Sequence, residues 1–183
     1  WKIGRAALAA SIASAALPMD LFLRDLERRA VHRVAGTAVF MTSNPDGVPV
    51  VLLHHFKHNK VLHQQVVLLA VLTERVPEVA AKDRVVMKDL GQGFYQVVAH
   101  YGFMQTPNVP EIMQACRVAG LLAQKADTSY YLGRETLLTT GRSGLPRWRK
   151  WLFMVLSRNA MPATLFFGIP PNRVVEMGAQ IEL

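Results

Sequence analysis

The feature that most constrains the fold is a pair of apolar segments separated by turn signals, between residues 37 and 73. The segment TAVFMT at 37–42 is short, β-branched and aromatic, which is typical of a buried strand, and the turn-forming SNPDGVP follows it. Pro49 suits the first turn of a helix, and QQVVLLAVLT at 64–73 predicts a second strand. Strand, helix and strand in this order predict a βαβ crossover, with parallel strands and a right-handed connection.

The rest of the chain adds strands and helices in a mixed order. The segments 84–90 and 93–104 flank Gly91-Gln92-Gly93 and predict a hairpin, in whose second arm Gln96 and His100 face away from the apolar set. Further expected elements are a helix over 108–120, a strand over 128–132, a helix from about Pro146 to Asn159, and a short helix after Pro162. The sequence therefore predicts an α/β fold with a mixed, partly parallel β-sheet flanked by helices.

The N-terminal residues predict a helical lead-in that is interrupted at Pro18, and the globular pattern begins at Gly36. Trp1 with nearby lysine and arginine is a mixture found where a helix leaves a bilayer, but composition alone favours an exposed amphipathic helix. The start at Trp1 rather than Met favours a fragment or a processed product. No apolar run approaches the ~20 residues of a spanning helix, and no cleavable signal peptide is evident.

The charge of the chain favours an anionic partner. Lysine and arginine outnumber aspartate and glutamate by 21 to 13, which gives a net charge of +8. The basic residues gather in an N-terminal and a late segment, so surface contacts are favoured over one nucleic-acid groove, and no nucleic-acid partner is expected. The single cysteine, Cys116, cannot form an internal disulfide, which is compatible with a reducing compartment.

The stretch LLHHFKHNKVLH at 52–63 is the strongest candidate for a metal site. His54 and His58 lie four residues apart on the polar face of the expected helix, which is a spacing that metals use. However, the HExxH arrangement of zinc hydrolases needs Glu where His55 stands. Surface or hydrogen-bonding histidines are therefore favoured over a zinc site, and His63 is expected to hydrogen-bond locally.

Other chemistry receives little support from the sequence. The loop after the first strand occupies a position where α/β folds bind ligands, but it lacks GxGxxG and GxxxxGK[ST]. Lys57, His58 and Lys60 could hold an anion, although cations at a helix C-terminus are also stabilising by themselves, and that explanation is favoured. No serine lies in a GxSxG context and no histidine adjoins Cys116, so neither an enzyme nor a cofactor is expected.

Several segments resemble one known family in order along the chain. AGTAVFMTSNPDGVPVVLLHHFKHNKVLHQQVVLLAV resembles the start of the cytoplasmic C-terminal domain of KUP-type bacterial potassium uptake transporters, and GFYQVVAHYGFMQTPNVP, DTSYYLGRETL and RNA…ATLFFGIPPNRVVEMG follow. The likeness spans about residues 34–183, which are the expected α/β domain, and it implies that residues 1–33 are a helical juxtamembrane segment leading out of the last membrane helix. The chain departs from the family pattern at four positions, where Ala35 and Val50 replace Pro, His55 replaces Asn and Gln64 replaces Glu.

The resemblance implies a permease of the bacterial cell inner membrane that imports potassium, with proton symport. This domain would lie on the cytoplasmic side, with its own transmembrane domain as partner, and would serve assembly and regulation. The ion-coordinating residues would lie outside this chain, and a homodimer is the expected oligomer because it covers apolar surface and sheet edges. The alternative is sensing of the nucleotide cyclic di-AMP, for which the basic candidates are Lys57, Lys60, Arg134 and Arg173.

Overall fold

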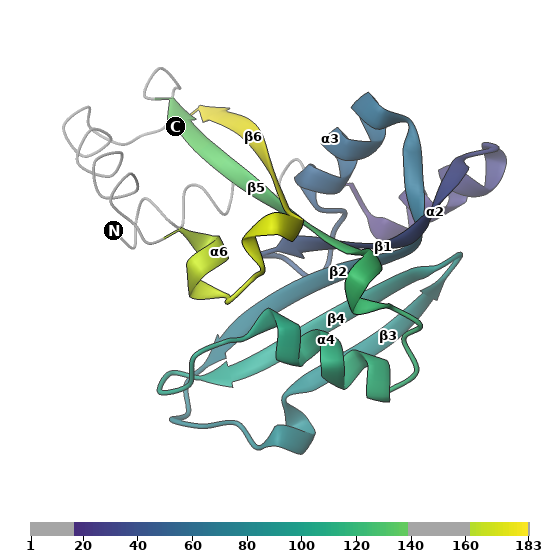
Figure 1. The fold of residues 1–183 in the computed structure, drawn as a ribbon. Helices are drawn as coiled ribbons and strands as arrows, with labels where there is room; N and C mark the ends of the chain where they lie inside the picture. Colours follow the sequence, from purple (N-terminus) through teal and green to yellow (C-terminus); the bar gives the residue numbers. More distant parts are fainter. Residues whose placement is uncertain (1–16, 139–161, 183) are drawn as a thin grey trace.

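The structure is a computed structural model that describes residues 17–138 and 162–182. A six-stranded β-sheet forms the centre of this described part (Figure 1). The strand order is β3-β4-β2-β1-β5-β6. The strands are β1 (His32–Thr42), β2 (Val61–Glu74), β3 (Val85–Gly91), β4 (Phe94–Gly102), β5 (Thr128–Leu138) and β6 (Val174–Glu182). The helices are α2 (Met19–Arg28), α3 (Val50–Asn59), α4 (Val109–Val118) and α6 (Ala163–Phe166), with short 3₁₀ turns η1 (Ala81–Asp83), η2 (Lys125–Asp127) and η3 (Pro171–Arg173).

The predicted mixed α/β fold is confirmed. Strands β1 and β2 pair in parallel with α3 between them, as the crossover prediction requires. Strands β2 with β4, β1 with β5, and β5 with β6 are also parallel, whereas β3 and β4 form the predicted antiparallel hairpin. Strand β1 starts five residues before the apolar segment because its first residues, His32 to Val34, pair with Val61 to His63 of β2, which apolar content alone does not reveal.

A bulge in β1 shows how closely the strand approaches its surroundings. The register of the β1–β2 pair shifts between Val34 and Thr37, and Gly36 in this bulge has a φ of 96°. A Cβ atom at Gly36 would lie 2.7 Å from the carbonyl oxygen of Asp127 in η2. Glycine is therefore required here both for its backbone conformation and for the space that it leaves.

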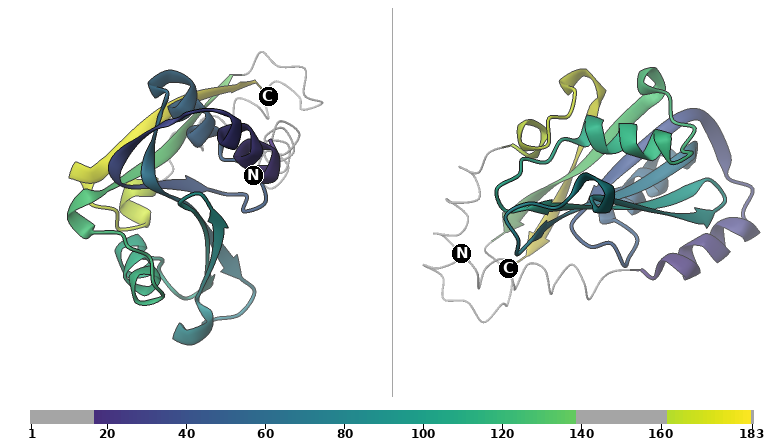
Figure 2. Two further views of the ribbon diagram at one scale, coloured as in Figure 1. Left: turned by 90° about the vertical axis from the view of Figure 1, so that its right-hand side faces the viewer. Right: turned by 90° about the horizontal axis from the view of Figure 1, so that it is seen from below.

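Helices cover both faces of the sheet, as Figures 1 and 2 show for α3 and α4. One core lies under α4 and includes Val39, Val67, Leu69, Val97, Ala99, Ile112, Met113 and Cys116. The other lies under α2 and α3 and includes Phe22, Leu26, Phe40, Leu52, Leu68 and Phe94. Alternate residues of β1 and β2 enter opposite cores, which is the arrangement expected for strands that are buried on both faces.

Near the two ends of the described chain, some predicted elements are confirmed and others differ. The helix expected after Pro18 is confirmed as α2, whose buried Phe22 and Leu26 pack on the sheet, while β1 begins at His32, before the predicted domain start at residue 34. The short helix after Pro162 is confirmed as α6, but strand β6 was not predicted. The helix expected over 146–159 lies outside the described residues.

None of the helices within residues 17–138 and 162–182 combines the length and the apolar character that a membrane crossing requires.

Candidate functional site

The histidine-rich stretch forms α3 and the first residues of β2. The rings of His54 and His58 lie 6.3 Å apart, centroid to centroid, with His54 half-buried and His58 exposed. No group of three or more His, Cys, Asp or Glu side chains in the described part of the chain is arranged to hold a metal ion. A zinc site at His54 and His58 would need its remaining ligands from elsewhere, as the sequence already indicated.

His55 points into the core instead of toward solvent, and only 2% of it is exposed. Its ring centroid lies 4.8 Å from that of Tyr131, 5.5 Å from that of Phe40 and 6.0 Å from that of His63. The buried position of His55 on the inner face of α3 was not predicted from the sequence. Its spacing of three and four residues from the buried Leu52 and Val51 would have placed it there.

Burial favours the neutral form of both His55 and His63. Removal from water lowers the pKa of His55, which the nearby His63 lowers further, and burial also lowers the pKa of His63. The Nδ1 atoms of both rings are buried and have no hydrogen-bond partner among the described residues. The prediction that the His63 side chain hydrogen-bonds locally is therefore wrong for its Nδ1 atom. The backbone carbonyl of His63 does accept a hydrogen bond, from Arg33 Nη1 at 2.9 Å.

The loop after β1 occupies the carboxyl end of that strand, but its polar groups already bond one another. Asn44 N–H donates to Thr42 Oγ1 at 3.1 Å, and Asp46 N–H donates to Asn44 Oδ1 at 3.0 Å. From β4, Gln96 Nε2 donates to the Pro45 carbonyl at 2.6 Å. Backbone N–H groups that bind phosphate must point outward without such partners, so the N–H groups of Asn44 and Asp46 are not available to a phosphate.

Lys57 and Lys60 lie at the C-terminal end of α3, whereas the loop after β1 leads into its N-terminal end. Lys57 and Lys60 are exposed, and Lys60 ends the helix with a φ of 56° while its N–H donates to the Phe56 carbonyl. Positive charges at this position interact favourably with the helix dipole. The placement agrees with the explanation that the sequence analysis favoured.

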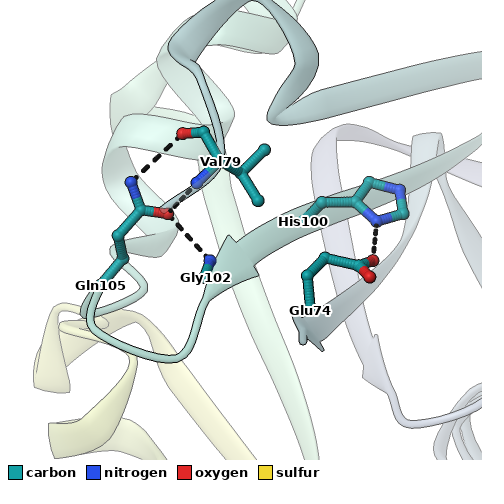
Figure 3. A network of polar contacts seen from close by, with 5 residues as sticks. All are labelled: Glu74, Val79, His100, Gly102 and Gln105. Atoms are coloured by element: carbon teal, nitrogen blue, oxygen red, sulfur yellow. Dashed lines mark hydrogen bonds and ion pairs between the residues drawn. The ribbon is translucent and has the colours of Figure 1, made fainter. Parts of the chain in front are cut away.

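A set of polar contacts joins the carboxyl ends of β2 and β4 and the segments that follow them (Figure 3). His100 Nδ1 lies 2.7 Å from Glu74 Oε1. Gln105 Oε1 accepts hydrogen bonds from the N–H groups of Val79 and Gly102, at 3.0 and 2.9 Å, and its Nε2 donates to the Val79 carbonyl at 3.2 Å. The Gln105 side chain thus fastens the segment after β2 to the end of β4.

We expect Gln105→Ala to lower the free energy of unfolding by about 1–2 kcal/mol, because two partly buried N–H groups lose their acceptor. Gln105→Glu keeps an acceptor oxygen and should cost less than Gln105→Ala. Urea denaturation of both variants and the parent chain measures the difference. Equal losses in the two variants would contradict the role assigned to Oε1.

An open hollow of about 560 Å³ lies on the face of the sheet that α4 covers, opposite to α3, between α4, η2, η3 and the start of β5. The buried Tyr130, only 5% exposed, lines its inner side. Its other polar lining residues are Asn108, Glu111, Gln114, Arg117, Asn172 and Arg173. The sequence analysis named Arg173 but not Arg117, because the fold alone brings α4 beside η3.

The structure does not gather the four basic candidates at one place. Arg173 lies in the hollow, on the α4 face of the sheet, whereas Lys57 and Lys60 lie at the end of α3, on the other face. Arg134 is an exposed residue of β5, and its Nη1 lies 3.6 Å from Glu176 Oε2. A ligand that contacts all four side chains of one chain is therefore incompatible with this fold.

Cys116 is unsuited to nucleophilic chemistry. It is fully buried in α4, and burial raises the pKa of its thiol to about 11, although the nearby Arg117 acts in the opposite direction. The thiol therefore remains protonated at neutral pH, and its contribution is to packing.

Comparison with known proteins places the chain in a family. The family described as the K+ potassium transporter C-terminal domain matches residues 35–183. A protein named "Probable potassium transport system protein Kup" from Anaeromyxobacter dehalogenans is 57% identical over the whole chain, which covers 28% of that relative. "Probable potassium transport system protein Kup 2" from Syntrophobacter fumaroxidans is 54% identical over the whole chain, which covers 29% of it.

The chain therefore belongs to the family of potassium transporter C-terminal domains. It spans less than a third of the length of the curated relatives that it matches. No solved structure matches it significantly.

Proposed function

We propose that this chain is the cytoplasmic C-terminal domain of a permease that imports potassium with proton coupling. The observation that carries the proposal is the identity of 57% over the whole chain to a relative named as a potassium transport system protein. The ion pathway would lie in other parts of the permease, and this domain would serve its assembly and regulation.

The arrangement of the described residues supports a non-catalytic role. Cys116 is inaccessible, the loop after β1 is bonded within itself, and the histidines of α3 divide between surface and core. Strands β3 and β6 end the sheet order, and such edges are surfaces at which a second copy can pair. We include a homodimer in the proposal for that reason.

Transport is tested with the complete gene that encodes this chain, expressed in a bacterium that lacks its own potassium uptake systems. We expect growth at limiting potassium and uptake of rubidium, and a protonophore should abolish that uptake. A correctly inserted protein without uptake would refute the transport proposal, whereas uptake that survives the protonophore would refute only the coupling.

The assembly role is tested separately, on the 183-residue chain. Light scattering at tens of micromolar protein should give the mass of a dimer. A strict monomer under these conditions would refute the homodimer without bearing on transport.

A further inference from the structure

The hollow between α4 and η3 has the composition of a binding site for a small organic anion. Arg117 comes from the last turn of α4 and Arg173 from η3, so two guanidinium groups from separate elements line one cavity. Guanidinium groups bind carboxylate and phosphate oxygens through paired hydrogen bonds. A volume of about 560 Å³ lies within the usual range of sites for small molecules.

The inner side of the hollow supplies a further polar group. Tyr130 is 5% exposed, and none of the hydrogen bonds found among the described residues uses its hydroxyl. Burial raises the pKa of Tyr130, whereas the positive charge of Arg117 acts against that rise, so this guanidinium lies within electrostatic reach of the phenol. The Tyr130 hydroxyl thus remains a neutral hydrogen-bond donor beside a positive charge.

Amide side chains extend the set of donors. Asn108 Oδ1 caps α4 by accepting from Glu111 N–H at 3.1 Å, which leaves the Asn108 amino group as a donor. Gln114 and Asn172 are exposed residues of the same lining. Amide groups of this kind can bond the oxygens of a ligand whose charge the arginines neutralise.

The one acid in the lining restricts the ligand. The charged residues of the lining are Glu111 and two arginines, so its net charge is positive and Glu111 is its only carboxylate. A ligand that is anionic throughout would be repelled by Glu111, whereas one with hydroxyl or amino groups away from its anionic end could donate to this carboxylate.

We propose that this hollow binds a small organic anion that carries hydroxyl or amino donors, with its carboxylate or phosphate between Arg117 and Arg173 and its donors toward Glu111. The inference goes beyond the transport proposal and does not depend on it. It assigns a ligand site to the α4 face of the sheet. Of the four basic candidates predicted from the sequence, only Arg173 lines this site.

Calorimetric titration of the 183-residue chain tests the proposal. The probes are citrate, inorganic phosphate, AMP and cyclic di-AMP, which separate carboxylate from phosphate and simple from nucleotide-bearing anions. We expect at least one organic probe to bind with a dissociation constant below millimolar, and Arg117→Gln and Arg173→Gln each to weaken it about tenfold or more.

The matched control is Arg24→Gln, which removes an exposed arginine of α2 on the other face of the sheet and should leave binding unchanged. Circular dichroism checks that each variant is folded. The proposal is overturned if no organic probe gives heat at millimolar concentration, or if Arg24→Gln weakens binding as much as the two hollow variants do. Neither of these results would affect the transport experiment.

Discussion

Phe40→Ala should lower the free energy of unfolding by about 3–5 kcal/mol, the usual cost of deleting a buried aromatic ring. Phe40 is fully buried near the carboxyl end of β1, and its ring stacks on Tyr131 with centroids 4.8 Å apart. It also meets the edge of the His55 ring at 5.5 Å. The cavity left by the substitution would lie among β1, β5 and α3, which leaves little freedom for the surroundings to collapse.

Urea denaturation followed by circular dichroism measures this loss. Phe103→Ala is the control, because this phenylalanine is 60% exposed and its removal should change stability by less than about 0.5 kcal/mol. Similar losses in the two variants would contradict the assignment of Phe40 to the core.

The second large effect is expected on acidification, because the surroundings of the buried His55 and the half-buried His63 lower the pKa of both side chains in the folded chain. The pKa values of His55 and His63 in the folded chain lie below the ordinary value of 6.5 that they have when unfolded. As the pH falls through about 6.5, the unfolded chain takes up protons that the folded chain does not, so stability decreases. With two such groups the slope can reach at most about 2.7 kcal/mol per pH unit.

This stability is fully present above pH 6.5 and is lost from there downward, until the pH reaches the lowered pKa values of the folded state. His55→Asn removes one of the two groups and should reduce the difference in stability between pH 7.5 and pH 5. His58→Asn, at an exposed histidine of the same helix, should leave that difference close to that of the parent chain. A His55→Asn chain with undiminished acid sensitivity would show that other groups cause it.

Local sequence signals identified the elements whose conformation depends on a few neighbouring residues. The hairpin between β3 and β4 turns at Gly91-Gln92-Gly93, where all three residues have positive φ values of 84°, 52° and 77°. Asn108 begins α4 through its side-chain cap, as its position before Pro110 and Glu111 indicated. Continuous apolar segments predicted β1 and β2 because strands buried on both faces need apolar residues throughout.

Strand β6 escaped prediction because it lies at the edge of the sheet. Its residues Val175 and Glu176 are both exposed, so its sequence shows neither a continuous apolar run nor a regular alternation. Its pairing with β5 begins at Tyr130 and Val174, which are far apart along the chain. Only the assembled sheet provides the backbone partners that make this segment a strand.

The crossover fold was readable from the amino-acid sequence because apolar runs and turn residues act through their near neighbours, and the family was readable from segments that resemble it in order along the chain. The inward direction of His55 and the placement of Arg117 and Arg173 in the lining of one hollow were decided by the tertiary structure. The reason is physical: whether a polar side chain lies inside or outside, and which distant charges share a cavity, depends on strand register and helix packing. Those quantities exist only once the whole sheet has formed.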